Sequence, residues 1–97
     1  MAVISGQKAV AAAGTAVTLV AATNRVNGPV QIKALGGNSG MIYVGNDGAG
    51  DVASTNGYEL DAGDSVIFEY VGDLINIIID AETNDDAVCW LALGSNM

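Results

Sequence analysis

Apolar and polar side chains alternate along several short stretches of this chain. The stretches VQIKAL (residues 30–35) and SVIFEY (residues 65–70) each have an apolar side chain at every second position. A period of two is typical of a half-buried β-strand. The stretch MIYVG (residues 41–45) places Ile42 and Val44 on one face, and it is predicted to be a further strand, paired through a short loop with the strand before it.

The other apolar stretches are also of strand length. The runs LINIIID (residues 74–80) and AVCWLAL (residues 87–93) flank an acidic turn and are too short for ordinary helices. Residues 7–22 are rich in alanine and could form a helix, but their valines and the Gly-Thr break favour two short strands joined by a turn. The sequence DAGD (residues 61–64) predicts a corner between two strands.

The recurrence of these strands predicts the fold class. Short strands separated by glycine, asparagine and aspartate indicate an all-β fold, an antiparallel β-sandwich or jelly roll of about eight short strands. No internal repeat and no linker divides the sequence, so residues 1–97 are predicted to form a single domain. Residues 1–25, which are basic and alanine-rich, are a candidate N-terminal arm or partner-contact segment.

The composition is that of a folded chain with a small core. Hydrophobic residues make up 51% of the sequence, which excludes the polar, charged composition of disordered chains. A chain of this length buries only about two-thirds of the surface that its unfolded form exposes. Burying apolar faces and strand edges against copies of itself would add stability, so we predict self-association.

The charges are few, mostly acidic and unevenly placed. The chain has 3 basic and 11 acidic residues, and its net charge is −8. The basic residues Lys8, Arg25 and Lys33 all precede the first acidic residue, Asp47. Because nucleic-acid binding requires clustered lysine and arginine, nucleic acid is not expected as a partner. The acidic side chains are expected to lie on a solvated outer surface.

Histidine, the commonest general base of enzymes, is missing from the sequence. Without histidine the chain cannot form a Ser-His-Asp triad or a histidine metal site. The carboxylate pairs Asp61 with Asp64 and Asp85 with Asp86 would have to face each other across a cleft, which so small a β-sandwich rarely builds. We therefore predict no enzymatic activity and no catalytic, cofactor-binding or metal-binding residues.

The stretch GNDGAGD (residues 45–51) has the look of a calcium or phosphate loop. Counted from Asn46, the third and fifth ligand positions of an EF-hand would be glycines, and neither phosphate-loop glycine motif is present. We interpret residues 46–56 as a connecting loop that tolerates substitution, with a weak calcium site as the alternative. The candidate residues for contact with a neighbouring molecule at its tip are Asn46, Asp47, Asp51 and Tyr58.

Neither the cysteine content nor the N-terminus indicates export. The single Cys89 lies within an apolar run, so we predict a buried free thiol. Residues 8–22 have some outline of a secretory signal, but Gly14, Thr15 and Thr18 interrupt it, and none is expected. No stretch of about 20 residues is uniformly apolar, so neither a transmembrane helix nor a membrane partner is expected.

Four segments together resemble a family of viral proteins. They are IKALGGNSGMIYVGN, NGYELDAGDSVIFEY, LINIIIDA and AVCWLAL, and the resemblance covers roughly residues 28–93. It is to small virion proteins encoded among the head genes of tailed bacteriophages, and most to capsid decoration, or cement, proteins. Similar modules occur in tail and fibre components. Where such proteins often have a glycine turn before the last strand, this chain has Asn84-Asp85-Asp86.

The resemblance implies a non-enzymatic protein of the virion. Such a protein is made in the host cytoplasm, binds the outside of the capsid, commonly as a homotrimer, and stabilises it by bridging capsomers. Its partners are copies of itself and the major capsid protein. Lys8 and Arg25 are the candidate capsid contacts, because a shell surface of negative sign would repel the acidic remainder.

The alternative is a phage tail or fibre module that binds a host-surface glycan or receptor. A glycan site usually shows exposed aromatic side chains beside aspartate or asparagine. Of the five aromatic residues, only Tyr58 adjoins the long loop, which favours the structural role.

Overall fold

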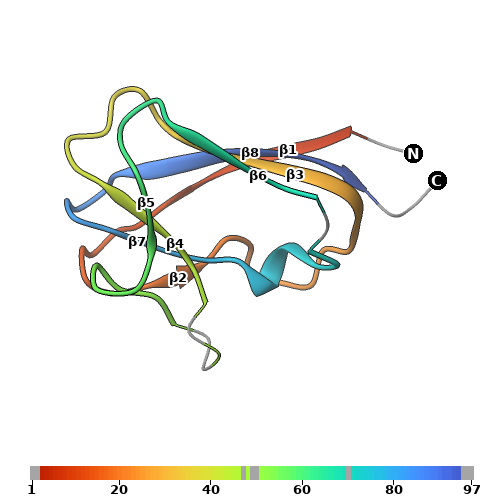
Figure 1. The fold of residues 1–97 in the computed structure, drawn as a ribbon, viewed down its shortest axis with the longest axis horizontal. Coiled ribbons are helices and arrows are strands. Elements are labelled where there is room, and N and C mark those ends of the chain that lie inside the picture. The colour runs from red at the N-terminus through yellow and green to blue at the C-terminus, as the bar shows by residue number, and fades with distance from the viewer. Residues whose placement is uncertain (1–2, 47, 49–50, 70, 95–97) are drawn as a thin grey trace.

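The computed structural model describes residues 3–46, 48, 51–69 and 71–94. This part of the chain is all-β, with eight strands in two antiparallel four-stranded sheets that pack face to face (Figure 1). The predicted β-sandwich of about eight short strands is confirmed.

The two sheets draw their strands from all along the chain. Sheet A has the order β1 (Val3–Ala9), β8 (Ala87–Gly94), β3 (Val26–Ala34) and β6 (Ser65–Phe68). Sheet B has the order β2 (Val17–Thr18), β7 (Ile78–Ala81), β4 (Ile42–Gly45) and β5 (Tyr58–Leu60). The edge strands are therefore β1 and β6 in sheet A, and β2 and β5 in sheet B.

The strand pairing is that of a jelly roll. The first strand pairs with the last, β2 pairs with β7, β3 with β6, and β4 with β5, all antiparallel. This is one long antiparallel hairpin, and rolling it up brings β3 beside β8 and β4 beside β7. Packing the strands into two sheets is one way in which antiparallel all-β proteins limit their unpaired strand edges.

The core lies between the sheets and follows the alternation in the sequence. Val30, Ile32 and Ala34 of β3 are fully buried, while Gln31 and Lys33 between them are exposed. From sheet B, Ile42, Val44 and Ile79 close the core from the other side. Burying each valine or isoleucine of this layer contributes about 1.5–3 kcal/mol, so the layer is a major source of stability.

Two predicted features of the strands are wrong. The strand after β3 was expected to pair with it, but β3 and β4 lie in different sheets. The run 74–80 is not one strand, because Leu74–Asn76 form a 3-10 helix, η1, before β7. Asp73 caps η1 by accepting a hydrogen bond from the Ile75 N–H, and Leu74 is fully buried beneath it.

The N-terminal region is built into the sandwich. Residues 3–9 form β1, which pairs with β8 along its full length, and Val10 and Leu19 are in the core. The alanine-rich segment forms strand at Gln7–Ala9 and again at Val17–Thr18 and contains no helix, in agreement with the preference for strands over a helix. The candidate arm is therefore an edge of the fold in its described residues.

Candidate functional site

The outer face of sheet A carries most of the exposed apolar surface. Among the described residues, four large hydrophobic side chains are strongly exposed, and three of them lie on this face: Val3 at 68%, Ile67 at 60% and Leu91 at 50%. Pro29 and Leu93 lie beside them in one shallow hollow. The three residues come from β1, β6 and β8, so the apolar surface extends across the sheet.

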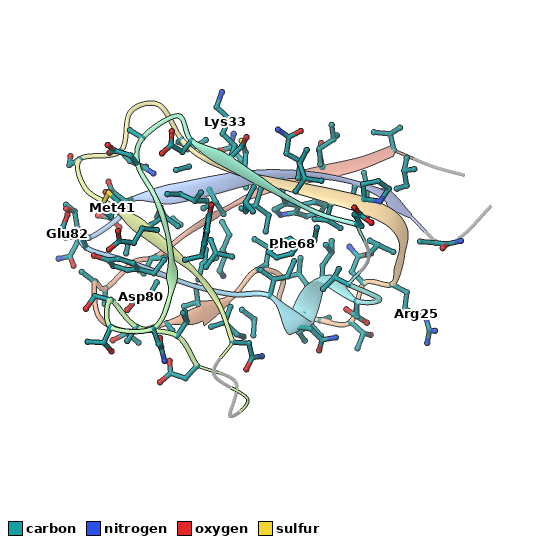
Figure 2. All side chains as sticks on the ribbon, viewed as in Figure 1. Arg25, Lys33, Met41, Phe68, Asp80 and Glu82 are labelled. Carbon is teal, nitrogen blue, oxygen red and sulfur yellow. The ribbon has the colours of Figure 1, made fainter. Side chains whose placement is uncertain are left out.

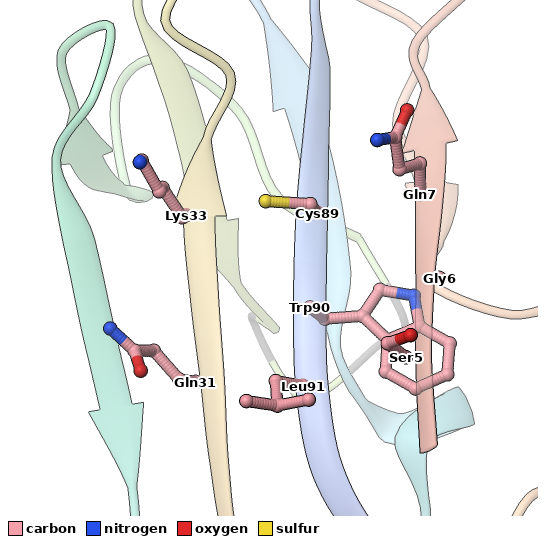
Figure 3. A pocket seen from close by; sticks show the side chains of 8 residues that line it. All are labelled: Ser5, Gly6, Gln7, Gln31, Lys33, Cys89, Trp90 and Leu91. Carbon is pink, nitrogen blue, oxygen red and sulfur yellow. The ribbon is translucent and has the colours of Figure 1, made fainter. Parts of the chain in front are cut away.

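A second, more polar hollow adjoins the first on the same face. Its outward side chains form two rows across the strands, which follow from the register (Figure 3). One row is Lys33, Cys89 and Gln7, and the other is Gln31, Leu91 and Ser5. The Gln31 Nε2 atom also donates a hydrogen bond of 3.2 Å to the Ser65 Oγ atom of β6.

The outer face of sheet A contains no carboxylate among its described strand residues. Its outward side chains include Val3, Ser5, Gln7, Ala9, Pro29, Gln31, Lys33, Ser65, Ile67, Cys89, Leu91 and Leu93. On a chain with 11 acidic residues and a net charge of −8, this is an unusual surface. It is apolar toward the end that holds Val3, Leu91 and Ile67, more polar toward Gln7 and Lys33, and Lys33 is the one charged side chain among these residues.

The outer face of sheet B, in contrast, is covered by the chain itself. Tyr43 and Ile78 point outward from this sheet, and Val52 of the β4–β5 loop packs on both as a second apolar cluster. Gly57 allows the close approach, because a Cβ atom there would lie 2.6 Å from the Tyr43 Cβ atom. The Gly14 N–H donates to Asp80 Oδ1 at 3.0 Å and so fixes the β1–β2 loop against the same sheet.

The loop of residues 46–56 is thus more than a tolerant connector. Val52 is only 2% exposed, and Asn46 bridges the loop to its surroundings, donating from Nδ2 to the Asn76 carbonyl and accepting from the Gly48 N–H. Asp51 is exposed and Tyr58 is 63% exposed, while Asp47 lies outside the described residues. The described residues contain no cluster of three or more potential metal ligands.

Cys89 is not buried as predicted. It is half-buried and points outward, between Lys33 and Gln7 in the polar hollow (Figure 3). The apolar run around it places Val88, Trp90 and Ala92 in the core. Because successive side chains of a strand point to opposite faces, Cys89 must share the outer face with Leu91.

Lys8 and Arg25 lie at opposite ends of the sandwich. Lys8 pairs with Val88, while Val26, beside Arg25, pairs with Gly94. The two positions are separated by about 20 Å along β8 at the usual strand rise. Lys8 is half-buried on the inner side of edge strand β1, where a lysine discourages pairing with a foreign strand. Arg25 is exposed (Figure 2).

Two acidic side chains are buried, contrary to the expectation that the acidic residues are solvated. Asp86 is 6% exposed and Asp80 is 3% exposed. Asp86 accepts hydrogen bonds from the backbone N–H groups of Ser39, at 3.0 and 3.1 Å, and Gly40, at 2.8 Å. Buried carboxylates need such donors, so both acids hold loops in place.

The carboxylate pairs do not form a catalytic arrangement in the described part of the chain. Asp61 and Asp64 are exposed, and Asp64 Oδ2 accepts the Asp61 N–H within the β5–β6 corner. Asp85 is exposed with a φ of 69°, and its neighbour Asp86 turns inward.

Burial raises the pKa of Tyr43, and the charges of Glu82, Glu59 and Asp80 raise it further, so this phenol stays protonated at neutral pH.

Asp73 links the start of β3 to η1. Its Oδ1 atom accepts hydrogen bonds from the Asn24 N–H at 2.8 Å and the Ile75 N–H at 3.0 Å. These two backbone hydrogen bonds lower the pKa of Asp73 below its ordinary value of 3.8, and the nearby charge of Arg25 lowers it to a smaller extent. The charged form is therefore favoured in the folded state.

We expect this carboxylate to make stability depend on pH in the acid range. A carboxyl group with a lowered pKa in the folded state stabilises the fold above the pKa of the unfolded chain. That stabilisation is lost as the pH falls from about 3.8 through the lower folded pKa. Asp73→Asn should be less stable than the wild type at neutral pH, and denaturant unfolding across a pH series should show this difference shrinking as the pH falls through that range. A difference that stays constant down to the lowest pH would contradict the role given to the charge.

Comparison with protein-family models, with curated proteins and with solved structures finds no match to this chain. Within the described ranges, no helix has the length and apolar character needed to span a membrane.

Proposed function

We propose that this chain is a non-enzymatic structural protein of a tailed bacteriophage. It binds the outside of the capsid as a homotrimer, bridges neighbouring capsomers and stabilises them. It is made in the host cytoplasm and ends in the virion. Its partners are copies of itself and the major capsid protein.

The observation that carries the proposal is the outer face of sheet A, which no described segment covers and which therefore indicates a protein that functions in an assembly. The chain covers the apolar outer face of sheet B with its own loops, through Val52 and the Gly14–Asp80 hydrogen bond. In contrast, Val3, Ile67 and Leu91 are exposed to solvent on the outer face of sheet A. Large exposed apolar patches with a polar rim mark protein interaction sites. The two hollows on this face are shallow, which suits a protein partner better than a small substrate.

The fold is compatible with the proposal but does not decide it. Jelly rolls occur both in viral capsid proteins and in lectins, and an argument from fold to function is one of analogy alone. The resemblance to decoration proteins favours the first class.

The aromatic residues argue against the glycan-binding alternative. Tyr43 and Trp90 are buried, and Phe68 is half-buried beside the core. Tyr58 is the one strongly exposed aromatic side chain in the described part of the chain. A single exposed ring offers little stacking surface for a sugar.

Arg25 is the better of the two predicted capsid contacts. It is exposed at one end of the sandwich, whereas Lys8 is half-buried on the inner side of β1. A contact between Arg25 and an acidic shell surface would speed association and strengthen binding, more so at low salt.

Co-sedimentation with expanded empty capsids of the phage that encodes the chain tests this function. The wild-type protein should sediment with the capsids up to a saturating ratio, and Arg25→Glu should bind several-fold more weakly. Arg25→Lys, which keeps the charge, is the matched control and should bind much more like the wild type. If the folded wild-type protein stays in the supernatant at every ratio, the proposed function is wrong. If Arg25→Glu binds like the wild type, only the assigned contact is wrong.

A further inference from the structure

We infer that the outer face of sheet A is the surface through which copies of this chain associate with one another. The inference rests on the proposed function only in that a decoration protein acts as an oligomer. It assigns the partner of this face to a second copy of the chain and leaves the shell contact to other surfaces.

The first argument is electrostatic. Two copies of a chain with a net charge of −8 repel each other, and a carboxylate buried at their contact would also have to lose its water. On the outer face of sheet A, the described strand residues include no carboxylate and one cation, Lys33. Copies that meet on this face keep most of their exposed acidic residues away from the contact, and Glu69, which directly follows β6, is an exposed carboxylate at the edge of the face.

The second argument is that the face can pair with a surface of its own kind. Its apolar end holds Val3, Leu91 and Ile67, and its other end holds Gln7, Cys89 and Lys33. Gln7, Gln31 and Ser5 can each donate and accept hydrogen bonds, so the same side chains on another copy can satisfy them. Protein interfaces combine apolar area with hydrogen-bonding side chains in this way. A strongly charged partner would find only Lys33 to pair with.

The third argument is size. The four strands have 7, 8, 9 and 4 residues, and at a spacing of about 4.8 Å they give a flat area of roughly 400 Å². A stable interface buries about 800 Å² of accessible surface on each partner. The face can therefore form a large part of such an interface, with the corrugation of the side chains and the adjoining loops supplying the rest. A domain this small also gains from the extra burial.

Sedimentation of the purified protein across a concentration series tests the inference. The wild type should sediment as an oligomer of the 9.7 kDa chain, and Leu91→Glu should sediment as a folded monomer. Ala62→Glu is the matched control, because it places the same charge on an exposed side chain of the β5–β6 corner, and it should keep the wild-type mass. A monomeric wild type, or a Leu91→Glu variant with unchanged mass, would overturn the inference.

Cys89 provides a second measurement that needs no substitution on the face. It is half-buried at the centre of the face, so its reaction with a maleimide should slow as the wild-type concentration rises and copies cover it. A labelling rate independent of concentration would overturn the inference even if Leu91→Glu failed to fold.

Capsid co-sedimentation separates the two proposals. An oligomer that depends on Leu91 but does not bind capsids upholds this inference and refutes the proposed function. A monomeric wild type that binds capsids, with Leu91→Glu losing that binding, upholds the function and shows that the face contacts the shell, so the inference would be wrong.

Discussion

Replacing Trp90 by alanine should lower the free energy of unfolding by about 3–5 kcal/mol, the usual cost of truncating a buried aromatic side chain. The stability of a whole domain is about 5–15 kcal/mol, so the variant should be close to unfolding. Trp90 is 9% exposed and belongs to the main core. It pairs with Gly6 of β1 on one side and Ile32 of β3 on the other.

Gly6 makes room for the indole ring. A Cβ atom at Gly6 would lie 2.7 Å from Cζ2 and 2.9 Å from Cε2 of Trp90, closer than such atoms approach. Gly6→Ala should therefore cost about 1–3 kcal/mol through overpacking. In the Trp90→Ala background the same change should cost much less, because the ring is gone, and the double-mutant cycle measures this coupling.

Urea unfolding followed by far-UV circular dichroism measures both effects. Tyr58→Ala is the control, because this exposed side chain should change stability by no more than about 0.5 kcal/mol. Equal costs of Gly6→Ala in the two backgrounds would show that the indole ring does not pack on Gly6.

Asp86→Ala should be the next most damaging change, with a loss of about 3 kcal/mol, because hydrogen bonds to a charged group contribute about 1.5–3 kcal/mol each. The substitution removes the acceptor for the Ser39 and Gly40 N–H groups. These residues connect β3 of sheet A to β4 of sheet B. The Asn38 side chain adds hydrogen bonds to both the N–H and the carbonyl of Ala87, so the corner is held on both sides.

A matched pair of variants isolates the carboxylate of Asp86. Asp86→Asn keeps one acceptor oxygen and should lose about half as much stability as Asp86→Ala. Glu69→Ala removes an exposed acidic side chain and should have little effect. If thermal unfolding finds Asp86→Ala as stable as Glu69→Ala, the corner does not depend on this carboxylate.

The alternation of side chains predicted the strands well but not their partners. Local period is enough to place Val30, Ile32 and Ala34 in the core, and the DAGD corner does carry the chain from sheet B to sheet A. The partner of β3 was mispredicted because a short loop favours a hairpin. In the jelly roll the same loop instead crosses between the sheets. It is held by the buried Asp86, which lies far away along the chain, so no local sequence pattern predicts this contact.

The sequence contained a sign of the exposed apolar outer face of sheet A, but we misread it. The run AVCWLAL is apolar at consecutive positions, and a continuous run places apolar side chains on both faces of a strand. We interpreted it as burial on both faces, which led to the wrong prediction for Cys89. Whether the outer face of a sheet is covered depends on loops that are distant in the sequence. Val52 covers sheet B, and no described segment plays that role over Leu91, which is 50% exposed.

The most direct test of the account is the temperature at which capsids release their DNA. DNA-filled, expanded capsids that lack this protein would be heated with and without the purified chain, and release followed by a dye that binds free DNA. The account predicts that the added protein raises the release temperature and that the effect saturates when the capsid sites are full. An unchanged release temperature, with the protein folded and in excess, would contradict the claim that this chain stabilises the shell.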